Sequence, residues 1–187
     1  MQNRTFILAD GENLVFRYQA SLKEGAEKTK QTYHIPDVLV WHTQITHAFL
    51  MEVIRVSYYT TQVGDEKKLD RTRRDIASYS YDFTFSRSEP GGNGCLCPYV
   101  YKKEKNSQKT KSVDINLTID ALRHTYNDSL DTLFLLSGDG DYIPLIQEVM
   151  RQGKKVVVGA FTNGLNPTLE HIADKFINLD GWLLKKT

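Results

Sequence analysis

Cysteine is scarce in this sequence, and its apolar runs are short. The two cysteines, Cys95 and Cys97, have neither a second pair nor a nearby histidine that would complete a zinc site. The first apolar run, residues 5–9, is too short for a signal peptide or a membrane span. The expected location is therefore the cytoplasm, and no membrane partner is expected.

A strong excess of charge of one sign is also missing. The net charge is +1, so the molecule is not a cationic body that coats nucleic acid indiscriminately. Residues 67–74 nevertheless carry five basic side chains against one acid, and residues 102–111 carry five lysines against Glu104. A polyanion would meet these two segments first. With 40% hydrophobic and 25% charged residues, the composition predicts a single packed domain over residues 1–187.

Short apolar runs alternate with segments of helical periodicity, which predicts crossover units. The expected fold class is therefore α/β, with a mostly parallel central sheet and helices on both faces. In such sheets, ligands bind beyond the carboxyl ends of the strands. The expected strands are residues 5–9, 54–60, 81–86, 132–136, 155–160 and 176–179, and the expected helices are residues 36–52, 65–79, 113–126, 142–152 and 165–175.

Two of these helices depend on the spacing of apolar residues. Pro36 suits the first turn of a helix whose apolar face, which includes Trp41 and Ile45, should pack on the sheet. In the helix from residue 113, apolar positions separated by four, three and four residues share one face: Ile115, Ile119, Leu122 and Tyr126. The polar segment after Gly11 is expected to be a loop.

Residues 89–112 are rich in Gly, Asn, Ser and Lys, which is typical of a long surface insertion. Its lysines and the interleaved Tyr99 and Tyr101 suit phosphate contacts and base stacking with single-stranded RNA or RNA loops. A solvated loop without a ligand is the simpler alternative. The candidate RNA-binding residues are Lys102, Lys103, Lys105 and Lys111. The sequence is also compatible with a homodimer.

Aspartates follow two of the expected buried strands. Asp10 ends the first strand, while Asp139 and Asp141 follow the strand at residues 132–136, so their side chains should meet at one edge of the sheet. Asp114, at the start of a helix, can reach that edge from the side. Clustered carboxylates repel one another, and an oxygen cage of this kind suits Mg²⁺ or Mn²⁺. Asp120 should point in another direction around the same helix.

Simpler readings exist for the segment SGDGD. It is compatible with a turn in which Asp141 caps the following helix. A calcium loop is disfavoured, because the twelfth position counted from Asp139 is Met150 and not a glutamate. A phosphatase of the haloacid-dehalogenase type requires an Asp-x-Asp after the first strand, whereas this chain has Glu12 as the second acid.

Four ordered motifs resemble the NYN domain, a PIN-like family that includes LabA-type proteins: LADGEN, KSVDINLTIDAL, LLSGDGDYIPLIQEVMRQGKKVVV and LEHIADKFINLD. The resemblance implies a Rossmann-like PIN fold and metal-dependent RNA cleavage. The implied catalytic and metal-binding residues are Asp10, Asp114, Asp139 and Asp141, supported by Asn13 and Ser137. Two alternatives stay open, a catalytically idle RNA-binding or regulatory module and the phosphatase.

Overall fold

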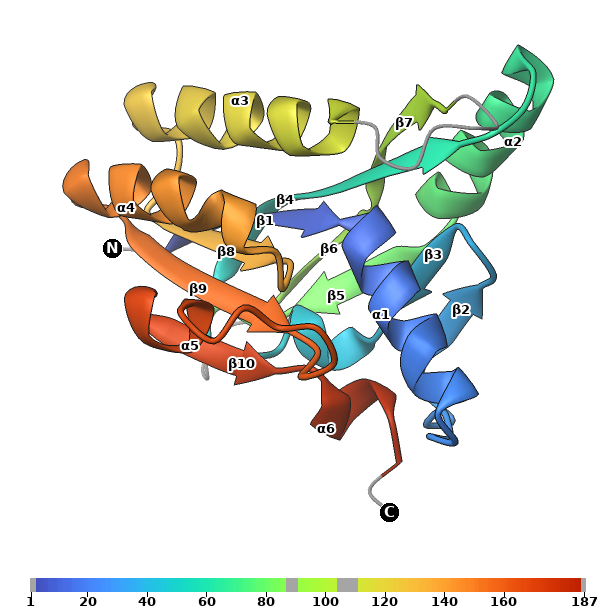
Figure 1. Cartoon of the computed structure of the whole chain (residues 1–187). Helices are drawn as coiled ribbons and strands as arrows, with labels where there is room; N and C mark the ends of the chain where they lie inside the picture. The colour runs from blue at the N-terminus through green and yellow to red at the C-terminus, as the bar shows by residue number, and fades with distance from the viewer. Residues whose placement is uncertain (1–2, 87–90, 104–110, 186–187) are drawn as a thin grey trace.

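The structure is a computed structural model that describes residues 3–86, 91–103 and 111–185. Its centre is a six-stranded sheet in the order β10-β9-β8-β1-β4-β7, and all neighbouring strands run parallel (Figure 1). The predicted α/β class with a parallel sheet is confirmed. The strands are β1 (Arg4–Asp10), β4 (Glu52–Gln62), β7 (Cys97–Lys102), β8 (Thr132–Leu136), β9 (Lys155–Ala160) and β10 (Lys175–Asn178).

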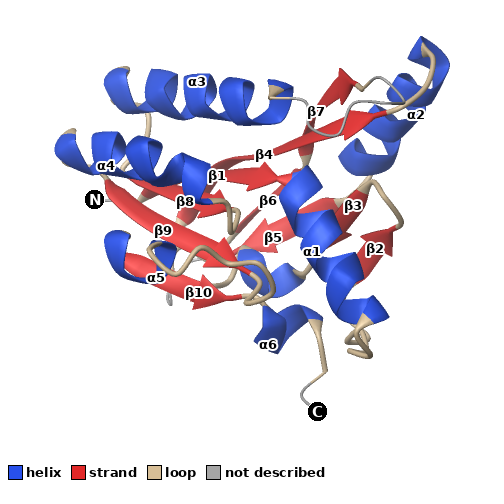
Figure 2. Ribbon diagram, viewed as in Figure 1, coloured by secondary structure: helices blue, strands red, loops and turns tan. Residues whose placement is uncertain are grey.

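Helices cover both faces of this sheet (Figure 2). The alternation of side chains along β1 divides the core, because Phe6 and Leu8 join one cluster while Ile7 and Ala9 join the other. The first cluster packs under α3 and α4, and the second packs under α1 and α2. The helices are α1 (Gly11–Lys23), α2 (Glu66–Ala77), α3 (Ser112–Tyr126), α4 (Ile143–Arg151), α5 (Leu169–Ile172) and α6 (Asp180–Leu183).

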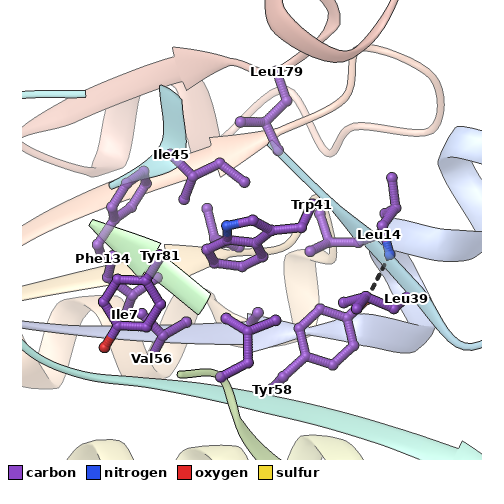
Figure 3. Packing of buried hydrophobic residues seen from close by; sticks show 14 of the residues in the cluster. Ile7, Leu14, Leu39, Trp41, Ile45, Val56, Tyr58, Tyr81, Phe134 and Leu179 are labelled. Carbon is purple, nitrogen blue, oxygen red and sulfur yellow. Dashed lines mark hydrogen bonds between the residues drawn. The ribbon is translucent and has the colours of Figure 1, made fainter. Parts of the chain in front are cut away.

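The prediction of a helix at residues 36–52 is wrong. The segment instead forms the hairpin of β2 (Tyr33–Ile35) and β3 (Leu39–Trp41), followed by the 3₁₀ turn η1 (Thr43–Ile45). Pro36 and Asp37 occupy the turn, which the Val38 N–H closes by donating to the Ile35 carbonyl at 3.1 Å. Proline followed by aspartate suits a β-turn as well as a helix start, and the hairpin is favoured because it buries Trp41 completely (Figure 3).

The prediction of a loop after Asp10 is also wrong. The segment forms the helix α1 rather than a loop, and Leu14, Val15 and Tyr18 bury its apolar face. The polar residues between them misled the prediction, because they face solvent on an amphipathic helix. At the other end of the chain, the helix expected at residues 165–175 is reduced to α5, Leu169–Ile172.

Helix α3 forms where it was predicted, but a different face packs on the sheet. Its buried residues are Val113, Leu117, Ala121 and Thr125. The predicted apolar face is largely exposed, with Ile115 52%, Ile119 46% and Tyr126 59% accessible. The buried face carries smaller side chains, which allow the helix to lie close to the sheet.

The predicted insertion at about residues 89–112 contains ordered strands in its described part. Strand β6 (Gly92–Cys95) pairs antiparallel with β5 (Ser80–Phe83), and β7 extends the central sheet beyond β4. The Tyr99 ring stacks on Tyr59 with centroids 4.7 Å apart, and Tyr101 packs against the core cluster under α3. Both rings therefore take part in packing, and stacking of RNA bases on them stays a prediction. Lys105 lies outside the described residues.

Candidate active site

Asp10 lies at the carboxyl end of β1, where the chain turns into α1. Its side chain is 3% exposed and accepts a hydrogen bond from the Asn13 N–H at 3.0 Å, which caps the helix. Burial raises the pKa of Asp10 to about 7, and the nearby Asp114 and Glu12 charges act in the same direction. The hydrogen bonds from Asn13 and Ser137 oppose that rise. A carboxyl group in this state is poised to hold a cation or a proton.

Tyr142 joins Asp10 to Asp114, which begins on a different element. Its hydroxyl lies 3.3 Å from Asp10 Oδ2 and 3.2 Å from Asp114 Oδ1. Asp114 is in the first turn of α3, and Tyr142 ends the 3₁₀ turn η2 (Gly140–Tyr142). Burial and the two carboxylates raise the pKa of the Tyr142 phenol far above its ordinary value, so the hydroxyl stays protonated and donates.

The loop after β8 provides the remaining polar groups. The Ser137 hydroxyl donates to Asp10 Oδ2 at 3.2 Å and accepts from the Asp139 N–H at 3.2 Å. Asn13 anchors the loop from α1, because its Oδ1 accepts from the Gly138 N–H at 3.1 Å. Ser137 and Asn13 thus hold Asp10 and the loop together.

Asp139 and Asp141 play different parts in this loop. Asp139 caps η2 by accepting from the Asp141 N–H at 3.0 Å. The helix that follows, α4, begins at Ile143 without a side-chain cap, so the capping role considered for Asp141 is wrong. Asp141 itself is solvent-exposed. We call Asp10, Asp114, Ser137, Asp139 and Tyr142 the acidic site; its members are connected through the hydrogen bonds described above.

Asp120 has other partners, although it shares α3 with Asp114. It accepts from the Tyr59 hydroxyl at 2.8 Å and from Arg123 at 2.9 Å. The Tyr59 phenol is buried and its pKa is strongly raised, so it acts as a donor. Asp120 therefore contributes to packing between α3 and β4.

A cleft of about 250 Å³ lies beside the acidic site, between α1 and the ends of β4 and β7; we call it the α1 cleft. Lys103, which follows β7, reaches Glu12 in this cleft with its Nζ 3.1 Å from Glu12 Oε1. The Thr61 hydroxyl donates to the same oxygen. Of the other candidate RNA-binding residues, Lys102 is exposed at the end of β7, and Lys111 is exposed just before α3.

The oxygen atoms of the acidic site are of the type that binds a hard divalent cation. Asp10, Asp114 and Ser137 offer oxygen atoms, and Mg²⁺ is commonly held by one or two carboxylates with waters completing its shell. Across residues 3–86, 91–103 and 111–185, no three His, Cys, Asp or Glu side chains form a group that could hold a metal ion. A cage of all four aspartates thus stays a prediction.

Sequence reasoning missed Tyr142 and the pair of Glu12 with Lys103. Tyr142 directly follows Asp141 in the motif SGDGDY, so its closeness to the aspartates was visible, but nothing indicated that its ring would turn inward. The partners Glu12 and Lys103 are far apart in the sequence, and only the pairing of β7 with β4 brings them together.

The class of this protein is a parallel α/β fold with a buried carboxylate, Asp10, and further aspartates near the carboxyl ends of its strands. The NYN domain family matches residues 4–180, and the chain belongs to that family. NYN domains belong to the PIN-like nuclease superfamily, whose members are generally hydrolases and commonly use divalent metals. In the described part of the chain, no helix has the length and apolar character needed to cross a membrane.

Similar proteins support the fold but carry no assigned activity. A crystal structure of a protein of unknown function from Vibrio parahaemolyticus superposes with a TM-score of 0.60, at 21% identity over 98% of this chain and 97% of that one. An uncharacterised protein of Methanocaldococcus jannaschii is 33% identical over 67 residues, which is 36% of this chain and 28% of that protein. The first comparison supports the α/β fold alone.

Proposed function

We propose that this chain is a metal-dependent endoribonuclease that hydrolyses RNA phosphodiester bonds at the acidic site. The observation that carries the proposal is the Tyr142 hydroxyl shared by Asp10 and Asp114, which draws together carboxylates from β1 and α3. Two carboxylates held this close favour a cation between or beside them. Membership of a nuclease family makes RNA hydrolysis the chemistry that best uses such a site.

Asp10 and Asp114 would hold the ion, with Asp139 and Asp141 completing the predicted set. A bound Mg²⁺ or Mn²⁺ would neutralise charge on the phosphate and lower the pKa of a water nucleophile. Asp10 or Asp139 would orient the attacking water by accepting one of its hydrogen bonds. Ser137 and Asn13 keep Asp10 and the loop after β8 in place during this step.

The RNA would approach along the lysine-bearing edge of the molecule. Lys102 and Lys111 are exposed on either side of residues 104–110, and Lys103 lies in the α1 cleft. These cations suit the phosphates of a single strand or a loop. We further propose action in the cytoplasm, with a homodimer as one form that size measurements in solution would detect.

An idle RNA-binding module is the second candidate, because the described residues hold no preformed group of three metal-binding side chains. Family membership disfavours the phosphatase. The position of Glu12 also disfavours the phosphatase, because Glu12 forms an ion pair with Lys103 and is not part of the acidic site.

Paired variants on one helix test the proposal. Asp114→Asn removes a charge from the acidic site, whereas Asp120→Asn changes the same helix at the carboxylate that contacts Tyr59 and Arg123. With RNA and Mn²⁺, cleavage by Asp114→Asn should fall by about 100-fold or more, a loss typical of removing one catalytic polar group. Asp120→Asn should cut within about twofold of the parent rate. If neither the parent nor the variants cut RNA, the idle module is favoured. If Asp114→Asn cuts at the parent rate with contaminating nuclease excluded, cleavage does not use the acidic site.

A further inference from the structure

The α1 cleft adjoins the acidic site, yet of its lining only Lys103 has a role in the function proposed above, as a phosphate contact. Glu12, inside the cleft, is two positions after Asp10, and its charge contributes to the raised pKa of that residue. A ligand in the cleft would therefore lie next to the carboxylates of the acidic site. If RNA is cut at the acidic site, a base neighbouring the cleaved bond would reach this position.

The size of the cleft suits a ligand as small as one nucleobase. Its volume of about 250 Å³ is below the ~300–1,000 Å³ of sites that take drug-sized ligands. Phe16 forms one wall and is 65% exposed, which is unusual for a phenylalanine beside a polar lining. The Arg17 guanidinium lies over the Phe16 ring, 5.3 Å from its centroid, and a nucleobase could stack on the exposed part of the ring beside the acidic site.

The polar lining places a cation and a carboxylate side by side. Lys103 and Thr61 both contact Oε1 of Glu12, so the carboxylate is held in a fixed position from one side. This pair offers a strong donor next to a strong acceptor, which is the pattern that the hydrogen-bonding edge of a base requires.

A second carboxylate stands at the rim of the cleft in a strained backbone conformation. Asp37 has φ of 60°, which is uncommon for a residue other than glycine. The positive φ belongs to the turn between β2 and β3. Gln19 fixes the Asp37 side chain beside the cleft, because its Nε2 donates to Asp37 Oδ1 at 2.9 Å and its Oε1 accepts from the Asp37 N–H at 2.9 Å. The same Oε1 lies 3.3 Å from His34 Nε2.

We propose that the α1 cleft binds a guanine base of the RNA, stacked on Phe16 and read by Glu12, Asp37 and Lys103. Guanine presents one acceptor, O6, beside two donors, N1–H and the 2-amino group, and this matches one ammonium and two carboxylates. Adenine, cytosine and uracil each have a single donor group on that edge. This inference rests on the proposed function and adds a base preference to it.

Binding without cleavage tests the cleft directly. The probes are short oligouridylates with one central guanosine, inosine or adenosine, titrated against the protein in EDTA by fluorescence anisotropy. The guanosine probe should bind about tenfold more tightly than the other two, since inosine lacks the 2-amino group. Phe16→Ala should weaken guanosine binding about tenfold, as expected for one lost base stack.

Two further variants distinguish a loss of base recognition from a general loss of folding or RNA binding. Asp37→Asn keeps the shape and tolerates the left-handed backbone, but it replaces an acceptor oxygen with a donor, so the preference for guanosine over inosine should disappear. Tyr126→Ala removes an exposed aromatic ring from the far end of α3 and should leave all three affinities unchanged. Thermal unfolding of each variant verifies the fold.

The results also distinguish this inference from the proposed function. Equal affinities for the three probes, no measurable binding, or an unaffected Phe16→Ala variant would overturn the guanine site even if the protein cuts RNA. Selective guanosine binding by a protein that cuts nothing under Mn²⁺ would support the α1 cleft and overturn the nuclease.

Discussion

The acidic site and the α1 cleft each contain a carboxylate at or just after the end of β1, Asp10 and Glu12. The two carboxylates differ in the groups that donate hydrogen bonds to them. Asp10 is 3% exposed and receives its hydrogen bonds from neutral groups, the Asn13 N–H and the hydroxyls of Ser137 and Tyr142. Glu12 is partly exposed and has a cation of its own, Lys103.

From this difference we infer that Asp10, and not Glu12, is the carboxylate suited to bind a metal ion. Neutral donors and a neighbouring Asp114 leave Asp10 with a raised pKa, so an external cation or a proton would stabilise it. Glu12 has its charge balanced within the protein, and it can take part in recognition without a metal. Proximity in sequence therefore does not give the two acids the same role.

The largest effect is expected in cleavage. Asp139→Asn removes one charge from the acidic site with little change in volume, so metal-dependent hydrolysis should fall by about 100-fold or more while RNA affinity stays within about twofold. Single-turnover cleavage under Mn²⁺ and binding in EDTA measure the two quantities. If this variant cut RNA at the parent rate, the acidic site would not be the site of hydrolysis, and the distinction drawn between Asp10 and Glu12 would be wrong.

The next effect is on stability as a function of pH. Because the pKa of Asp10 is raised from 3.8 to about 7 in the folded protein, the unfolded chain loses this proton first, and the free energy of unfolding should fall as pH rises from about 4 to about 7. Asp10→Asn should remove this loss. In EDTA at pH about 8, the variant should be more stable by up to about 4 kcal/mol. Urea denaturation across this pH range measures the difference.

Asp131 provides the control with the opposite sign. The Arg4 guanidinium lowers the pKa of that carboxyl to about 2, so its stabilising effect is present at neutral pH and is lost as pH falls through the acidic range. Asp131→Asn should therefore be less stable than the parent at neutral pH. If Asp10→Asn behaved like Asp131→Asn, Asp10 would be charge-balanced in the same way as Glu12.

The smallest effect is expected from the lysine-bearing edge. Replacing Lys102, Lys103 and Lys105 together by glutamine should weaken RNA binding about tenfold at low salt and flatten its salt dependence, because phosphate contacts are lost. Cleavage at saturating RNA should persist. Binding isotherms at several salt concentrations measure both changes, with Lys23, Lys28 and Lys30, which are exposed at and after the end of α1, replaced as the matched control. An unchanged salt slope would mean that RNA does not use this edge.

The sequence alone determined the α/β class, the strands at residues 132–136 and 155–160, and the family resemblance. Continuous apolar runs such as these have one stable place, a strand buried on both faces, so their position needs little tertiary information. The placement of Asp10, Asp139 and Asp141 at one edge of the sheet also followed from the sequence, because the parallel strands β1 and β8 end at that edge.

Only the tertiary structure decided which face of a helix is buried and which distant residues meet. Helix α3 packs through Val113, Leu117 and Ala121 although the face with Ile115, Ile119 and Tyr126 offers more apolar area, since the smaller side chains allow a closer approach to the sheet. Pro36 and Asp37 form a turn because the hairpin buries Trp41, a gain that the local sequence does not encode. The shared hydroxyl of Tyr142 and the pairing of Glu12 with Lys103 depend in the same way on strand order, which places residues from separate parts of the chain at one edge.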